Sequence, residues 1–75
     1  MEKDMVNSPE HYTTSRVEAI YVIEDAIDKA PSNMQGFLHG QVLKYMLRLW
    51  LKHEDNYKQD AEKARWYLDK LIQSL

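Results

Sequence analysis

The stretch from residue 37 to 52 constrains the fold most strongly, because it has the period of a helix yet is apolar around most of its circumference. At about 100° per residue, its large apolar side chains spread over roughly two thirds of the helix surface. A chain of 75 residues offers too few neighbouring helices to cover so wide an arc. We therefore expect the uncovered part to contact another subunit. The apolar side chains of the stretch are Leu38, Val42, Leu43, Met46, Leu47, Leu49 and Trp50.

One helix is predicted before this stretch. Ser15 and Glu18 have the spacing of a capping box, in which each side chain satisfies a free backbone N–H of the first turn. Pro31 ends the helix, because a proline disfavours the α conformation in the residue before it. The first helix is therefore expected over residues 15–30.

The central helix is expected over residues 33–52, and a third helix follows the polar break after it. Asp55 or Asn56 can cap this third helix, which we expect over residues 56–75. Gly40 in the central helix lowers helix propensity, so a close approach to its backbone is predicted. The apolar positions of the third helix are Tyr57, Ala61, Ala64, Leu68, Leu71, Ile72 and Leu75.

The chain as a whole is predicted to be all-α, because no alternating strand pattern of useful length occurs in it. Three helices joined by short loops indicate a three-helix bundle or helical hairpin. Residues 1–14 are expected to form an irregular arm, with a turn signal at Asn7-Ser8-Pro9. We therefore expect one all-α domain over residues 1–75.

Composition narrows the class of protein. The absence of cysteine excludes disulfides and thiolate metal sites, and no tight His, Asp or Glu spacing predicts a metal or other cofactor. A net charge of −2 argues against a nucleic-acid partner. The apolar runs are too short for a membrane span, and no secretion signal is recognised, so a cytoplasmic protein is expected. Homo-oligomerisation remains as the means of stabilising so short a chain.

A narrow cationic stripe interrupts the apolar surface of the central helix. Lys44 and Arg48 lie one turn apart in it, with Gln41 and Lys52 in the same wedge. A solvated face, or an ion pair with Glu24 or Asp28 of the first helix, would explain the stripe. A point charge beside a fork-shaped donor also suits a phosphate group. The candidate phosphate-binding residues are Lys44, Arg48, His11, Tyr12, Gly40, Tyr45 and Tyr67.

Trp66 is the second unusual residue, because it projects among charged side chains on the polar side of the third helix. An exposed tryptophan is typical of an interface or a ligand platform. A ring lying over lysine stems, or packed on the N-terminal arm, is the alternative. The candidate oligomer-interface residues are Leu43, Leu47, Trp50 and Trp66.

Known catalytic motifs are missing. The sequence has no G-x-x-x-x-G-K-[ST] loop and no G-x-S-x-G elbow. Glu24 and Asp28, four residues apart, with Glu62 as a third carboxylate, resemble the Mg²⁺ ligands of all-α nucleotide pyrophosphohydrolases. The second acidic pair of that pattern is lacking. No catalytic residue is therefore predicted, and Mg²⁺ is expected only for a phosphotransfer reaction.

Four segments together resemble a family of small conserved tailed-phage proteins of unknown function, some of which carry a nucleotide-kinase label. The segments are PEHY (9–12), VEAIYVIED (17–25), FLHGQVLKYMLR (37–48) and EKARWYLDKLI (62–72). The chain departs from the family pattern at Gln41, where the family usually has Asn, and at Leu49-Trp50-Leu51, where it often has Gly and Lys. The matching positions are His11, Tyr12, Glu18, Glu24, Phe37, Gly40, Lys44, Tyr45, Arg48, Lys63, Ala64, Trp66, Tyr67 and Leu68.

The resemblance and the cationic stripe together favour one function over two others. The favoured one is a phage accessory protein that binds a phosphate-bearing ligand, first of all a nucleotide, without catalysis. Such a protein could sequester a nucleotide signal of host defence. The alternatives are a kinase-like nucleotide phosphotransferase without a P-loop, and a phage-encoded inhibitor or adaptor that binds a host protein.

Overall fold

The computed structural model describes residues 18–75. Its helices are α2 (Ala19–Ile27), α3 (Asn33–Leu47) and α4 (Tyr57–Ser74). Two short 3-10 turns, η1 (Leu49–Leu51) and η2 (Glu54–Asn56), connect α3 to α4. No β-strand occurs in residues 18–75. The predicted all-α class with three helices is therefore confirmed.

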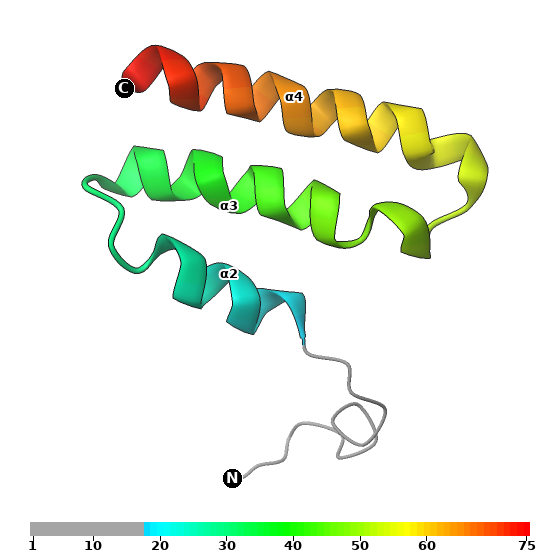
Figure 1. Cartoon of the computed structure of the whole chain (residues 1–75), viewed down its shortest axis with the longest axis horizontal. Helices are drawn as coiled ribbons and strands as arrows, with labels where there is room; N and C mark the ends of the chain where they lie inside the picture. Colours follow the sequence, from blue (N-terminus) through cyan, green and yellow to red (C-terminus); the bar gives the residue numbers. More distant parts are fainter. Residues whose placement is uncertain (1–17) are drawn as a thin grey trace, which may run out of the picture.

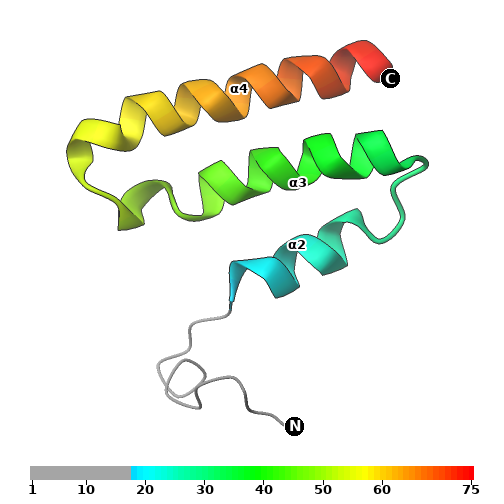
Figure 2. The ribbon, with the colours of Figure 1, turned by 180° about the vertical axis from the view of Figure 1, so that it is seen from behind.

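The three helices lie side by side in one layer, with α3 between α2 and α4 (Figure 1). The same order is seen from behind (Figure 2). The structure extends over 40 × 34 × 14 Å, and the shortest dimension is close to the diameter of about 10–12 Å of a single helix with its side chains. The radius of gyration, 14.3 Å, exceeds the value of about 11 Å expected for a compact chain of this length. Within the described residues, no second layer of helices covers either face.

Two glycines allow α2 and the loop after it to pack closely on α3. A Cβ atom added to Gly40 would lie 3.3 Å from Ile23 Cγ2, and one added to Gly36 would lie 3.3 Å from the Cβ of Ala30. The close backbone approach predicted at Gly40 is therefore present. The group that approaches it is the side chain of Ile23, so this glycine serves the packing of α2 on α3.

A hydrogen-bonded start of α3 ties the two long helices together. The Ser32 hydroxyl accepts a bond of 3.1 Å from the backbone N–H of Gln35 and donates one of 2.9 Å to the Gln35 Oε1 atom. The Gln35 amide in turn donates to the backbone oxygen and hydroxyl of Ser74, both at 3.2 Å. The spacing of Ser32 and Gln35 is that of a capping box. The start of α3 is thereby fixed beside the end of α4.

The structure corrects the predicted helix boundaries. The first helix was expected over residues 15–30, but Glu18 has extended backbone angles and α2 covers only Ala19–Ile27. The predicted cap Ser15 lies outside the described residues. The central helix begins at Asn33 as predicted but ends at Leu47, five residues before the expected end at Lys52. The third helix begins at Tyr57, one residue after the predicted start.

The early end of α3 has a visible cause in the connection that follows. Leu49 turns inward and is buried. Lys52 reaches the first turns of α4, where its Nζ atom lies 3.2 Å from Oδ2 of Asp60. Asp60 is only 2% exposed and makes no hydrogen bond through this oxygen within the described residues. The attraction between the two charges therefore compensates for much of the burial of the carboxylate, and Lys52 does not extend the stripe of Lys44 and Arg48.

The seam between α3 and α4 uses part of the predicted apolar stripe of α4 and adds Asp60 to it. The residues of α4 that turn toward α3 are Asp60, Ala64, Tyr67 and Leu71, of which Asp60 and Ala64 are fully buried. Leu68, Ile72 and Leu75 were expected on the packed face, but all three are exposed. The packed stripe is shifted because Asp60 is buried in it, and hydrophobic periodicity does not count a charged residue as apolar.

The contact of Ile23 with Gly40 predicts a size limit at this position. Replacing Gly40 by Val should lower the free energy of unfolding by about 1–3 kcal/mol, because the larger side chain overpacks the α2–α3 contact. Gly40→Ala should be close to neutral, because a gain in helix propensity of about 1 kcal/mol offsets the tight contact. Urea denaturation measures both, with Lys58→Val at an exposed position of α4 as the control. Equal losses in Gly40→Val and Lys58→Val would show that α2 does not pack on α3 here.

The buried carboxylate of Asp60 predicts an asymmetry between two substitutions. Lys52→Met should destabilise the protein by about 2–4 kcal/mol, because it leaves Asp60 buried without a countercharge. The double variant Lys52→Met with Asp60→Leu should recover most of that loss, since the unpaired charge is removed as well. Thermal unfolding followed by circular dichroism gives both values. A double variant no more stable than Lys52→Met would mean that the ion pair does not explain the burial of Asp60.

Candidate functional site

Four aromatic side chains gather on one face of the layer, between α3 and α4. Tyr67 is at their centre: its ring centroid lies 5.0 Å from that of Trp66, 6.0 Å from Tyr45 and 6.2 Å from Phe37. The Tyr45 ring stacks on Tyr67, whereas the other two meet it edge-on. We call this surface the aromatic groove and define it by Phe37, Tyr45, Trp66 and Tyr67.

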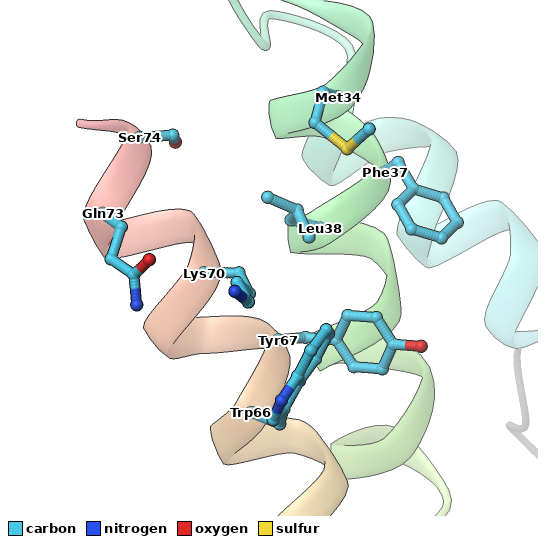
Figure 3. A pocket seen from close by; sticks show the side chains of 8 residues that line it. All are labelled: Met34, Phe37, Leu38, Trp66, Tyr67, Lys70, Gln73 and Ser74. Atoms are coloured by element: carbon cyan, nitrogen blue, oxygen red, sulfur yellow. The ribbon is translucent and has the colours of Figure 1, made fainter.

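The antiparallel pairing of the two helices explains why these residues meet. Tyr67 belongs to the stripe of α4 that turns toward α3, and Trp66 precedes it on the outer flank of α4. Figure 3 shows Tyr67 reaching from α4 toward α3, with Trp66 beside it and Phe37 on the opposite helix. Phe37 and Trp66 remain about half exposed. The rings are thus held by packing on one side and are available to a partner on the other.

Two shallow depressions share the Trp66–Tyr67 pair as a common wall. The first depression, drawn in Figure 3, has apolar residues of α3 on one side and polar residues of α4 on the other. The second depression lies toward the start of α4 and is more polar. The first is lined by Met34, Phe37, Leu38, Trp66, Tyr67, Lys70, Gln73 and Ser74, and the second by Tyr45, Gln59, Glu62, Lys63, Trp66 and Tyr67.

Three lysines form the rim of the aromatic groove. The Nζ atoms of Lys44 and Lys63 lie 5.3 and 5.5 Å from the centroid of the Tyr45 ring. The Nζ atom of Lys70 lies 5.3 Å from the centroid of the Trp66 ring. None of these ammonium groups forms an ion pair with a carboxylate of residues 18–75. The rim therefore concentrates positive charge on a chain whose formal net charge is −2.

The ion pairs considered as an alternative for the cationic stripe do not form within the described residues. Asp28 lies near its neighbour Lys29, with 3.9 Å between Oδ2 and Nζ. Neither Lys44 nor Arg48 pairs with Glu24 or Asp28. The charge of Lys44 is therefore balanced by the Tyr45 ring and by solvent.

The structure brings together three of the seven predicted phosphate-binding residues, namely Lys44, Tyr45 and Tyr67. Arg48 follows one turn after Lys44 and ends α3. It is half-buried, and its Nε atom is buried without a hydrogen-bond partner among the described residues. Gly40 packs on Ile23, away from the groove. His11 and Tyr12 lie outside the described residues.

The four predicted interface residues do not lie together. Trp66 belongs to the aromatic groove. Trp50 lies in η1 and packs edge-on against Tyr57, with 4.9 Å between the ring centroids. Leu47 is exposed, and Leu43 is half-buried. The tryptophans thus belong to two separate surfaces of the protein.

Lys63 and Lys70 contribute to the groove but were not among the predicted site residues. Both lie on the flank of α4 that carries Trp66, three residues before it and four residues after it. This i−3, i+4 spacing around an exposed tryptophan was available in the sequence. Their relation to Tyr45 depends on the register of α3 against α4, which the sequence pattern left open.

The chemistry of the groove is that of binding: flat rings offer stacking surfaces, and the lysines offer charge to an anion. Among residues 18–75, no group of three His, Asp or Glu side chains is arranged to hold a metal ion. None of the described helices is long and apolar enough to cross a membrane.

Comparison with known proteins identifies a family. A search of curated proteins and a search of solved structures each found no match. The model of one protein family, described as a protein of unknown function (DUF3310), matches residues 6–69. The match includes α2, α3, the connection after it and most of α4, and therefore every residue of the aromatic groove. The chain belongs to the DUF3310 family of proteins of unknown function.

Proposed function

We propose that the aromatic groove binds a phosphate-bearing ligand with a flat aromatic part, a nucleotide above all, and that it does so without catalysis. One observation carries the proposal. Lys44 and Lys63, from two different helices, converge on the ring of Tyr45 without a carboxylate partner in residues 18–75. Two ammonium groups beside one ring give the groove a positive potential, so the binding of an anion there is favourable.

The rings and the lysines have separate roles in such a complex. A nucleobase stacked on an aromatic side chain contributes about 1–3 kcal/mol, and Trp66 offers the most accessible ring of the groove. Charge-assisted hydrogen bonds from ammonium groups to phosphate oxygens are stronger than neutral ones. Arg48 follows Lys44 by one turn and supplies a further donor. A ligand with both a base and a phosphate should therefore bind better than either part alone.

The biological setting follows from the resemblance to tailed-phage proteins. In our proposal the protein is a phage accessory protein that acts in the cytoplasm of the host cell. Binding without turnover removes a nucleotide from solution, which is the chemistry needed to sequester a signal of host defence. A transfer assay with labelled ATP separates this role from that of a kinase-like phosphotransferase, because a sequestering protein returns its nucleotide unchanged.

An adaptor that binds a host protein is the second candidate, favoured by the apolar half of the groove. Met34, Phe37 and Trp66 are all exposed there, and methionine and aromatic residues are enriched in protein interfaces. Substitutions separate the two candidates. A protein partner held by the apolar half is lost in Trp66→Ala but retained in Lys44→Ala, whereas a nucleotide is weakened by both.

Isothermal titration calorimetry with ATP, GTP, adenosine and inorganic phosphate tests the nucleotide proposal. We expect a nucleoside triphosphate to bind more tightly than adenosine or phosphate. Lys44→Ala and Lys63→Ala should each weaken binding about tenfold, which corresponds to about 1.4 kcal/mol for one lost charge-assisted contact. Trp66→Ala should weaken binding by a similar or larger factor through the loss of stacking.

Lys58→Ala is the matched control, because Lys58 is an exposed lysine on the same helix outside the groove. Its affinity for the nucleotide should equal that of the unchanged protein. An equal loss of affinity in Lys58→Ala and Lys63→Ala would show that only the net charge of the protein matters for binding. The absence of heat with every nucleotide at millimolar concentration would refute the proposal.

A further inference from the structure

The face of the layer opposite the aromatic groove is an exposed apolar surface. On α4, helical geometry places Leu68, Ile72 and Leu75 about 160° around the axis from Lys63 and Lys70. The buried stripe with Ala64 lies between the two sets, so they occupy opposite faces of the layer. Helical spacing likewise places Met46 about half a turn of the circumference from Phe37 on α3.

We call this surface the apolar face and define it by Met46, Trp50, Leu68, Ile72 and Leu75. Their exposed fractions are 46%, 71%, 42%, 57% and 84%. Trp50 adjoins the start of α4 through its contact with Tyr57. Five large apolar side chains exposed along one α3–α4 hairpin exceed the scattered apolar residues normal on a monomer surface.

The described part of the chain has a core too small to offset the free-energy cost of this exposed apolar surface. Only Leu38, Leu49 and Ala64 are buried apolar residues within residues 18–75. So small a buried set is below what stabilises an independent helical domain, which normally gains a second layer, a metal or a disulfide. Disulfides are excluded because the chain has no cysteine. For the part of the chain from residue 18 onward, covering the apolar face is the remaining source of hydrophobic stabilisation.

We propose that a second copy of this chain covers the apolar face, so that two helical layers pack back to back. The five side chains expose on the order of 600 Å² per chain, and two copies together reach about 1,200 Å², the lower limit of a stable protein interface. A two-fold axis near the middle of α4 brings each α4 against its counterpart in the antiparallel direction. The core then lies between α3–α4 hairpins, as in a four-helix bundle.

Charge at the border of the apolar face agrees with this symmetry. Arg65 and Asp69 flank Leu68 on the outer side of α4, and neither forms an ion pair within residues 18–75. An antiparallel two-fold axis level with residue 67 along α4, on the face opposite the Tyr67 ring, places Arg65 of each copy opposite Asp69 of the other. Both aromatic grooves remain on the outer surfaces, so this inference is independent of what the grooves bind.

Sedimentation equilibrium on the full chain tests the assembly. We expect a particle of twice the chain mass of 8.9 kDa at micromolar concentration. Ile72→Glu should weaken self-association at least about 100-fold, because two unpaired carboxylates would be buried at the symmetric interface. Gln59→Glu, which adds the same charge on the groove side, should leave the dimer intact.

A chemical cross-link complements this test, because it changes only one residue of the apolar face. Leu68→Cys introduces the only cysteine of the chain, close to the predicted axis, and a short bis-maleimide should join two copies in high yield. Gln59→Cys should not cross-link under the same conditions. If Ile72→Glu fails to fold, the unfolding temperature of the unchanged protein decides, because it rises with concentration only for an oligomer.

The proposal would be overturned by a strictly monomeric protein. At 100 μM, sedimentation equilibrium would then give a mass of about 8.9 kDa at every rotor speed. The proposal would also be overturned by a dimer that survives Ile72→Glu and gives no Leu68→Cys cross-link, because its interface would then lie elsewhere.

Discussion

A single layer of helices has two broad faces, and this chain is too short to cover either one with its described helices. α3 packs against a neighbouring helix on each of two sides. The side with the glycines packs on α2, and the side with Leu38 packs on α4. Among residues 18–75, nothing covers the two broad faces of α3, so both are surface. The chemistry of these two surfaces differs sharply, with aromatic rings and lysines on one and aliphatic side chains with Trp50 on the other. That difference links the fold of the chain to both the ligand and the partner that we propose.

In our account the two faces have different roles: the apolar face contributes stability, and the aromatic groove binds the ligand. An apolar face gains free energy when water leaves it, whatever the detailed shape of the partner, and this suits a permanent contact between copies. The groove contains charges that stay solvated until an anion replaces the water, and this suits reversible binding of a small ligand. Lys52 and Asp60 connect the two by fixing the turn after α3, which sets the register of Tyr45 against Lys63 and Tyr67.

Sequence periodicity predicted the helical class and the start of α3, because both depend on local signals such as the Pro31 break and the apolar repeat. It failed at the end of α3, where a buried Leu49 and the pair of Lys52 with Asp60 override helix propensity. It placed Ala64 and Leu71 correctly on the packed side of α4 but missed Asp60, since a buried aspartate is invisible to an apolar pattern. Lys44, Tyr45 and Tyr67 were predicted from the sequence as phosphate-binding candidates, but Lys63 joins them only through the tertiary register.

The two methionines on opposite faces allow the most direct test of the two-faced layer. Met34 lines the aromatic groove and is 62% exposed, whereas Met46 belongs to the apolar face and is 46% exposed in the single chain. Oxidation by dilute hydrogen peroxide, followed by peptide mass spectrometry, compares their rates in the folded protein. If the apolar face is buried between copies, Met34 should be oxidised readily and Met46 should be protected at least about tenfold. Similar rates at both methionines would show that both faces of the layer are open to water.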